Sequence, residues 1–387
     1  MRRQYCTPGP DASGWRAGAP ARERVYTVAG VGTARARIRR RQLATIVLVA
    51  CTITPVFNVL TSEASFRQVV QGALDAFLIS LAVSGYLLFL RDGTWRPWFR
   101  RLGFRLDLIL SSAIVLALFL VGRAAGQVLT SLQPRRFLGS FTDPHLMLAL
   151  PFFAAAAVTI QFVLQMNRMI GTNVLGYFAA GVYRAPKAEE RIFLFLDLQG
   201  STQLAERLGS ARYFELLRRF VDDLSDPVLE AEGEIYQYAG DEVVITWSIE
   251  VGVRAANCVA CFFAVRAAIE DQAARYEREF GVVPRFRGGL HGGSVTGGEL
   301  GDLRQQIVFV GDILNTAARL EEYAKRTGLD LVISGALLER LTLPPGIEAT
   351  RCGELELRGK EAPVAAFSLI ETPARGASRA ASSAHRS

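Results

Sequence analysis

Cysteine and histidine are scarce in this sequence. Its 387 residues include five Cys and three His. Cys258 and Cys261 form the single Cys-x-x-Cys pair, so no second pair completes a four-cysteine metal site. Both lie in a helical pattern beside Phe262, and we therefore expect them to pack in a core rather than to serve a metal or redox role. Nothing in this pattern indicates a disulfide-bonded secreted protein.

The first 42 residues lack the short apolar core and the cleavage site of a secretory signal. They carry many arginines among Gly, Ala and Pro. We expect residues 1–42 to form a disordered basic arm. Because an apolar stretch follows directly, these arginines favour anchoring at a membrane over binding to nucleic acid, which we do not expect as a partner.

Apolar residues, by contrast, are abundant. Hydrophobic residues make up 50% of the chain, the net charge is +7 and the mean hydropathy is +0.22. Such a composition is too apolar for an ordinary soluble protein and predicts a membrane part. Four stretches have about the length of a membrane span, and the third is the shortest. They are Leu43–Leu60, Gly72–Leu90, Leu106–Val121 and Leu146–Leu164.

The arginines also predict an orientation. They precede the first stretch, fill the segment between the second and third, from Arg91 to Arg105, and follow the fourth at Arg168. By the positive-inside rule both termini face the cytoplasm, in a multi-pass protein of the inner (plasma) membrane surrounded by lipid. Arg135 and Arg136 weaken this bias without reversing it.

One acidic residue, Asp75, falls within the second apolar stretch. An ionisable group inside a span is a hypothesis for ligand binding or helix packing. Because Asp75 lies close to the predicted boundary of its stretch, the sequence favours exposure at the membrane interface.

The C-terminal half opens with an acidic residue at the end of an apolar run. Ile192 to Leu196 predict a strand that is buried on both faces, and Gly200, Ser201 and Thr202 predict the start of a helix. Asp197 lies at the end of the strand. Its simplest interpretation, without any catalytic role, is a helix N-cap or an ion-pair partner.

A second carboxylate is placed in the same way. Residues 234–248 form two β-rich runs joined at Gly240 and Asp241, which predicts a hairpin with Asp241 at its tip. If the first strand pairs beside this hairpin, Asp197 and Asp241 can converge and hold two Mg²⁺ ions against a phosphate-rich substrate. A lone Gly-Asp is usually only a turn.

The third element is an apolar strand that leads through Gly311 into a helix. Asn315 and Arg319 are four residues apart and share one face of that helix. An amide beside a guanidinium can bind and stabilise an anionic phosphorus centre. The simpler interpretation is that both residues lie on a solvated helix face.

Together the three elements resemble the catalytic domain of the class III nucleotidyl cyclases, the adenylate and guanylate cyclases, over residues 190–370. The resemblance rests on the strand before Gly200, the Gly-Asp-Glu hairpin, Arg287-Gly-Gly-Leu-His-Gly-Gly293, Gly311-Asp-x-x-Asn-x-x-x-Arg319 and Leu357-Arg-Gly-Lys360. It implies an α/β ferredoxin-like domain that follows the α-helical transmembrane domain of four helices, and the order of predicted elements is compatible with that fold.

The resemblance also implies roles for the matching residues. Asp197, the backbone carbonyl of Leu198 and Asp241 would bind metal, two Mg²⁺ or Mn²⁺ ions in each active site. Asn315 and Arg319 would stabilise the transition state. In the family each site is shared between two catalytic domains, which implies a homodimer here.

Substrate-binding roles follow in the same way. Lys360 would grip the triphosphate, Arg287 is a weaker phosphate candidate, and the backbone from Gly200 to Thr202 would cradle phosphates. Gln237 and Val308 stand where adenylate cyclases usually have Lys and either Asp or Thr, and guanylate cyclases usually have Glu at the first position. Val308 cannot hydrogen-bond through its side chain. ATP is expected as the family's commonest substrate, while GTP and pyrimidine triphosphates stay open.

The implied reaction joins the ribose 3′-oxygen to the α-phosphate of a nucleoside triphosphate, with release of pyrophosphate and formation of a 3′,5′-cyclic nucleotide. Such a product serves in intracellular signal transduction. Two alternatives remain: a degenerate cyclase domain that only binds nucleotide or dimerises, and a membrane receptor that acts through protein contact alone.

These expectations divide the chain into five parts. They are the basic arm 1–42, the transmembrane domain 43–165, a linker 166–189, the catalytic domain 190–371 and a disordered tail 372–387. Within the catalytic domain we further expect a helix over 210–230, a long helix over 251–280, a glycine-rich strand pair over 284–299 and strands near Leu331, Leu355 and Phe367.

Overall fold

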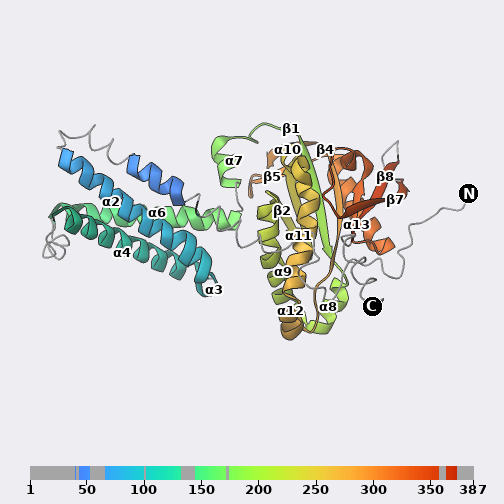
Figure 1. The fold of residues 1–387 in the computed structure, drawn as a ribbon, viewed down its shortest axis with the longest axis horizontal. Helices are drawn as coiled ribbons and strands as arrows, with labels where there is room; N and C mark the ends of the chain where they lie inside the picture. The colour runs from blue at the N-terminus through green and yellow to red at the C-terminus, as the bar shows by residue number, and fades with distance from the viewer. Residues whose placement is uncertain are drawn as a thin grey trace, which may run out of the picture. The chain divides into compact units, whose positions relative to one another are not determined.

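The computed structural model describes residue 40 and residues 43–52, 66–99, 102–131, 144–170, 174–356 and 363–372. Its contacts divide the chain into two compact units that meet at Leu175 and Gly176 (Figure 1). The domain boundaries expected from the sequence stay predictions, although α6 continues to Ile170 and β1 already begins at Lys187.

The first unit is almost entirely helical in its described part. Its elements are the helix Leu43–Thr52, α2 (Phe66–Gly85), the π-helix η3 (Tyr86–Thr94), α3 (Arg96–Phe99), α4 (Phe104–Ser131) and α6 (Pro144–Ile170). Residues 53–60, the second half of the first predicted span, lie outside the described residues. The stretch predicted to be the shortest, Leu106–Val121, belongs instead to a helix of 28 residues, because the helix continues past the last wholly apolar turn into Gly122 to Ser131.

Three stretches in the described chain are long and apolar enough to cross a membrane: Val69–Arg91, Phe104–Leu129 and Ile249–Asp271. The last one belongs to the second unit, where 67% of it is buried in the core. The two remaining stretches support membrane association of the first unit, and the count of four spanning helices stays a prediction.

Glycines on α4 allow α2 to approach closely. A Cβ on Gly122 would lie 2.9 Å from Cγ1 of Ile79, and a Cβ on Gly126 would lie 1.7 Å from Oδ1 of Asp75. Small residues four apart are the usual means of close helix packing in membranes. Asp75 therefore lies against α4, half-buried, rather than exposed at the interface as its position in the sequence favoured.

A partly buried ion pair joins η3 to the start of α4. Arg91 is 2% exposed and lies 2.9 Å from Asp107 at the start of α4. Asp107 also accepts hydrogen bonds from Ser111 and Gln165, and Arg91 donates to Gln161. The charge of Asp107 is thus compensated from η3, α4 and α6, which explains how an acidic residue is accommodated there.

The second unit is built on one mixed sheet with the strand order β2-β3-β1-β4-β6-β8-β7, and β5 pairs with β4. Its strands are β1 (Lys187–Leu198), β2 (Glu234–Ala239), β3 (Glu242–Ser248), β4 (Phe286–Leu300), β5 (Gln306–Val310), β6 (Leu331–Ser334), β7 (Ile347–Leu355) and β8 (Val364–Glu371). Its helices are α7 (Val174–Ala180), α8 (Ser201–Leu208), α9 (Ser210–Glu230), α10 (Ile249–Val253), the 3₁₀ turn η4 (Arg254–Ala256), α11 (Asn257–Asp271), α12 (Ala273–Phe280), α13 (Asp312–Thr327) and α14 (Gly335–Leu338).

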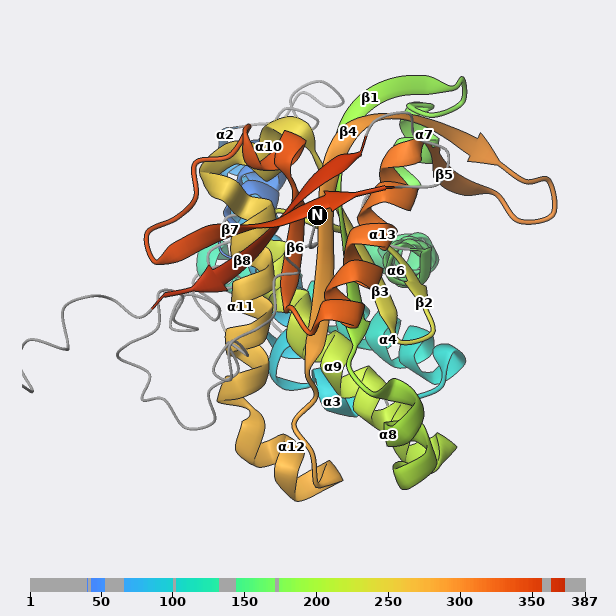
Figure 2. The same ribbon diagram turned by 90° about the vertical axis from the view of Figure 1, so that its right-hand side faces the viewer.

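The first four strands and the helices α9 and α11 form a β-α-β-β-α-β unit with antiparallel pairing, the connectivity of a ferredoxin-like fold. β1 lies in the middle, as its apolar run predicts. Ile192, Leu194 and Leu196 point to the core beneath α9 and α11, whereas Phe193 and Phe195 point to the α13 side. α11 and α13 lie on opposite sides of these strands (Figure 2).

The structure corrects two expected elements. Residues 284–299 do not form a strand pair: β4 is a single strand of 15 residues that turns into β5. The helix expected over 251–280 is broken, since Ala255 and Ala256 adopt positive φ angles and α12 follows as a separate helix. Tertiary packing overrides the helix propensity of alanine here, because Gly252 of α10 lies tight against Ile192 and Trp247 of the sheet.

The glycines of β4 are sites of close helix approach rather than turns. A Cβ on Gly289 would lie 2.2 Å from the backbone nitrogen of Glu321 and 2.3 Å from the carbonyl oxygen of Ala317. Both atoms belong to the backbone of α13, which cannot yield as a flexible side chain can. The helix therefore packs directly on the strand.

We predict that Gly289→Ala lowers the free energy of unfolding by about 1–3 kcal/mol or more, because α13 must move away from β4. Thermal unfolding of the purified full-length protein measures the change. Gly298→Ala on the same strand is the matched control, since its Cβ meets nothing nearer than 3.8 Å. Equal melting temperatures for the two variants would contradict this account of the packing.

Candidate active site

Two aspartates meet at one edge of the central strands. Asp197 follows the last residue pair between β1 and β3, and Asp241 occupies the two-residue turn that opens β3. Gly240, with a φ of 69°, supplies the left-handed conformation of this turn. Burial raises the pKa of Asp197, and the nearby charge of Asp241 adds to the rise. The two carboxylates are thus close enough to repel each other.

This arrangement fits a divalent cation. Oδ2 of Asp241 is buried and has no hydrogen-bond donor among the described residues. Paired carboxylate oxygens of this kind are the ligands that Mg²⁺ prefers. The described chain holds no cluster of three or more His, Cys, Asp or Glu side chains that could bind metal, and a metal role for the backbone carbonyl of Leu198 stays a prediction.

Three further residues surround the pair, and two of them, Lys325 and Glu321, lie outside the quoted motifs. Lys325 of α13 places its Nζ 2.8 Å from Oδ2 of Asp197. One turn earlier, Glu321 is buried, and burial together with the charge of Asp197 raises its pKa to about 7. Burial also raises the pKa of Glu242, next to Asp241. The position of Glu321 on the apolar side of α13 is the sequence signal that could have identified it as a buried carboxylate.

Arg287 lies at the same edge. It is directly opposite Asp197 in the pairing of β1 with β4. Its positive charge acts on Glu321, whose pKa it lowers, although burial and the neighbouring carboxylates dominate. The carboxylates of Asp197, Asp241, Glu242 and Glu321 thus act electrostatically on one another at this edge, where Arg287 and Lys325 supply positive charge.

The turn after β1 can receive phosphate groups. Gly200 has a φ of 68° and precedes α8, and no side chain caps the first turn of that helix. The N–H groups at Ser201 and Thr202 therefore face outward at a helix N-terminus, which favours anions. Tyr213 of α9 lies beside this turn, and burial and the charge of Asp241 raise its pKa.

Asn315 and Arg319 are not brought to the aspartates within one chain. Both are exposed on α13, where Arg319 pairs with Glu322 at 2.9 Å. Lys325, which does reach Asp197, lies ten residues beyond Asn315, or about 15 Å along the helix. Asn315 and Arg319, the two candidates for transition-state stabilisation, thus share a helix with Lys325 but do not point toward the aspartates.

Of the two residues expected to contact the base, Val308 is distant from the aspartates. Val308 of β5 pairs with Gly298, which is about 35 Å along β4 from Arg287 at 3.3 Å per residue. Gln237 is exposed on β2, directly after a bulge at Tyr236. Lys360 lies outside the described residues.

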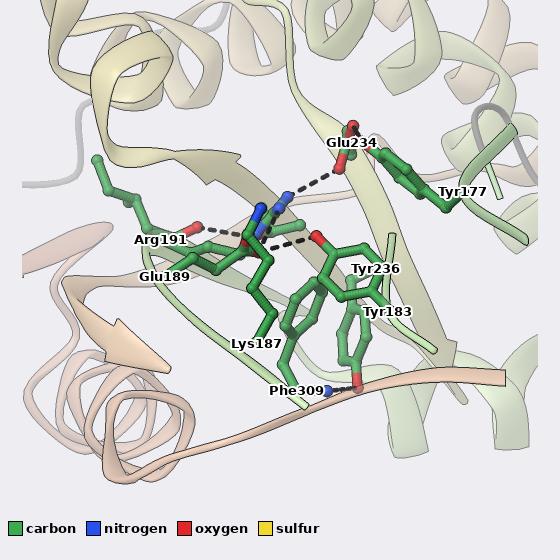
Figure 3. Close-up of polar contacts among 10 residues, drawn as sticks. Tyr177, Tyr183, Lys187, Glu189, Arg191, Glu234, Tyr236 and Phe309 are labelled. Carbon is green, nitrogen blue, oxygen red and sulfur yellow. Dashed lines mark hydrogen bonds and ion pairs between the residues drawn. The ribbon is translucent and has the colours of Figure 1, made fainter. Parts of the chain in front are cut away.

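A polar network ties the start of this unit to the strands that carry those two residues. Arg191 is 4% exposed and donates hydrogen bonds to Glu189 and Glu234, and its guanidinium stacks 4.7 Å from the centre of the Phe309 ring (Figure 3). Tyr177 of α7 donates to the same Glu234 at 2.8 Å. α7 is therefore bonded directly to β2 through Glu234, and the buried guanidinium of Arg191 connects the same carboxylate to Phe309 of β5.

Two further sets of polar side chains are buried in the core. Cys258 and Cys261 lie in the core on α11, as expected, and burial raises the pKa of Cys258 to about 12. The ring nitrogen Nδ1 of His291 lies 2.7 Å from Oγ of Ser334 in the interior, which is a structural contact.

Comparisons with known proteins agree with this arrangement. Residues 184–371 match the family described as the adenylate and guanylate cyclase catalytic domain. Adenylate cyclase 2 of Rhizobium meliloti (strain 1021) is 40% identical over 220 residues, which cover 57% of this chain and 61% of that protein. Adenylate cyclase 1 of the same strain is 29% identical over 160 residues, or 40% of this chain and 24% of that protein. The chain thus spans less than two thirds of either relative.

The fold is also shared with a solved structure. A bacterial light-regulated adenylyl cyclase superposes with a TM-score of 0.51 at 16% identity, over 61% of this chain and 68% of that one. With this fold, the paired aspartates and the family match over the same residues, residues 184–371 are a catalytic domain of the adenylate and guanylate cyclase family, the class III nucleotidyl cyclases.

Proposed function

We propose that this protein is a membrane-bound adenylate cyclase that converts ATP to 3′,5′-cyclic AMP and pyrophosphate. The observation that supports the proposal is the pair Asp197 and Asp241 at the sheet edge, where Oδ2 of Asp241 is buried and has no hydrogen-bond donor among the described residues. The names of the two relatives favour ATP. Because Gln237 and Val308 do not match the usual base-binding residues, GTP and pyrimidine triphosphates are the alternatives.

Mg²⁺ or Mn²⁺, two ions per site held by Asp197, the Leu198 carbonyl and Asp241, would supply neutralisation of the triphosphate and a lower pKa for the ribose 3′-hydroxyl. The chain itself binds and orients the substrate. The N–H groups from Gly200 to Thr202 receive phosphate oxygens, and Arg287 and Lys360 add positive charge. In-line attack by the 3′-oxygen on the α-phosphorus breaks the bond to pyrophosphate and closes the cyclic phosphate ring.

Asn315 and Arg319 stabilise the negative charge that grows on the phosphorus centre. Since both point away from the aspartates of their own chain, a second copy supplies them. A symmetric homodimer formed through the catalytic domains then contains two sites, each with the aspartates of one protomer and the Asn and Arg of the other. Gln237 and Val308 contact the base from the same side as Asn315.

The membrane-bound character rests on the apolar helices α2 and α4. We propose that the first unit spans the inner membrane, surrounded by lipid, with both termini in the cytoplasm, as the arginine distribution predicts. The catalytic unit then meets cytoplasmic ATP. A degenerate cyclase domain that only binds nucleotide is the second candidate, and the intact set of matching residues disfavours it.

We predict that the detergent-solubilised full-length protein forms one preferred cyclic nucleotide, cyclic AMP, when ATP, GTP, CTP and UTP are each supplied with Mg²⁺ or Mn²⁺. Chelation of the metal and the substitution Asp197→Asn should each abolish product formation, since both remove the cation site. Mn²⁺ should also raise the melting temperature of the wild type but not of Asp197→Asn. No product from any nucleotide, in folded and dimeric protein, would favour the binding-module alternative.

For Arg319→Ala we predict a turnover roughly 10²- to 10³-fold lower, because one preorganised donor to the transition state is lost. Steady-state rates of pyrophosphate release measure the effect. Arg351→Ala, which removes an equally exposed arginine from β7, is the control and should retain wild-type turnover. Wild-type activity in dimeric Arg319→Ala would rule out the assigned role.

A heterodimer tests the shared site directly. Co-expression of Asp197→Asn and Arg319→Ala chains with different tags, followed by tandem purification, yields dimers with one intact site. We predict roughly half of the wild-type activity in these heterodimers, although each parent homodimer is nearly inactive. A heterodimer as inactive as its parents would mean that each chain builds its site alone.

A further inference from the structure

Lys325 is the residue at the sheet edge to which the proposed catalysis gives no role. It lies in the last turn of α13, and its Nζ is 2.8 Å from Oδ2 of Asp197. Among the described residues it is the one cation that forms an ion pair with Asp197. Arg287 lies directly opposite Asp197 on β4, but no ion pair joins these two within the described chain.

The ammonium group of Lys325 is surrounded by negative charge. The hydrogen bond to Asp197 and the charges of Asp197, Glu321 and Asp241 raise the pKa of Lys325, so the group stays positive. The carboxylates of Asp197 and Asp241 also act on each other. Lys325 therefore compensates part of the repulsion between the two proposed metal ligands.

The exposure of the two partners shows which of them is free to move. The side chain of Lys325 is 56% exposed, whereas that of Asp197 is 13% exposed. Lysine carries its charge on a flexible four-carbon stem, and an exposed ion pair of this kind contributes little to stability. The ammonium group can therefore move into solvent while Asp197 keeps its place at the end of β1.

A divalent cation and this ammonium group compete for the same carboxylate. A cation that binds Oδ2 of Asp197 has to replace Nζ of Lys325, because Nζ already lies at hydrogen-bond distance from that oxygen. A cation that binds the other oxygen of Asp197 is repelled by the neighbouring ammonium charge. In both cases Lys325 lowers the affinity of the site for metal.

We propose that Lys325 is an internal counter-ion of the metal site, which holds the Asp197 carboxylate and is released when a divalent cation binds there. The inference rests on the metal-binding role proposed for Asp197 and concerns metal affinity rather than the chemical step. Removal of the counter-ion should tighten metal binding. Damage to a merely structural contact would have the opposite effect.

The test measures Mn²⁺ binding in the absence of nucleotide. The detergent-solubilised full-length protein is heated at a series of Mn²⁺ concentrations, and Trp247, which is buried in the catalytic unit, contributes to the fluorescence that follows unfolding. The rise in melting temperature gives the half-saturating Mn²⁺ concentration. For Lys325→Met we expect this concentration to fall roughly two- to fivefold, which corresponds to the loss of one exposed ion pair.

Arg326→Met is the matched control. Arg326 is the next residue of α13 and is also exposed, but its guanidinium lies 5.7 Å from the centre of the Tyr323 ring. This variant removes the same charge and should bind Mn²⁺ as the wild type does. Equal shifts in both variants would mean that only net charge matters, and unchanged Mn²⁺ binding in Lys325→Met would mean that no exchange occurs. Either result would overturn the proposal.

Asp197→Asn separates this inference from the proposed function. If Mn²⁺ stabilises the wild type but not Asp197→Asn, the metal site is supported, and a negative result for Lys325→Met then counts against the counter-ion alone. If Mn²⁺ does not stabilise the wild type, or stabilises Asp197→Asn equally, the metal site and the counter-ion are refuted together.

Discussion

The direct contact between α13 and β4 determines how the catalytic unit is arranged. At Gly289 the helix backbone lies where any side chain would have to be, so the helix has little freedom to rotate or slide. This single contact places Lys325 beside Asp197 and buries Glu321 behind it. It also turns Asn315 and Arg319 outward. The incomplete site within one chain is thus a direct result of close backbone packing.

Much of this unit could be predicted from the sequence because its signals are local. The continuous apolar run at Ile192 predicts a doubly covered strand, and Gly240-Asp241 between two β-rich runs predicts a hairpin; both are observed. The glycines of β4 misled the prediction, since glycine in a strand can mean either a turn or close approach of another backbone. Only the position of α13, a tertiary fact, distinguishes these two meanings.

The interactions of Lys325 and Arg191 could not be predicted from the sequence, because these too depend on tertiary structure. Lys325 is 128 residues from Asp197 in the chain, and Glu234 is 43 residues from Arg191. A charge on a helix or strand is usually a solvated one, and the sequence does not reveal its partner across the fold. The same holds for Asp107, whose charge is balanced by Arg91 and which accepts a hydrogen bond from Gln165 of a distant helix.

The network around Arg191 has a mechanical consequence. Tyr177 and Arg191 hold the two oxygens of one carboxylate, that of Glu234, so α7 cannot turn about its axis without pulling on β2. The strand is weakest two residues further, where the bulge at Tyr236 interrupts its pairing with β3. A small rotation of α7 would therefore displace Tyr236 and Gln237 about the buried guanidinium of Arg191.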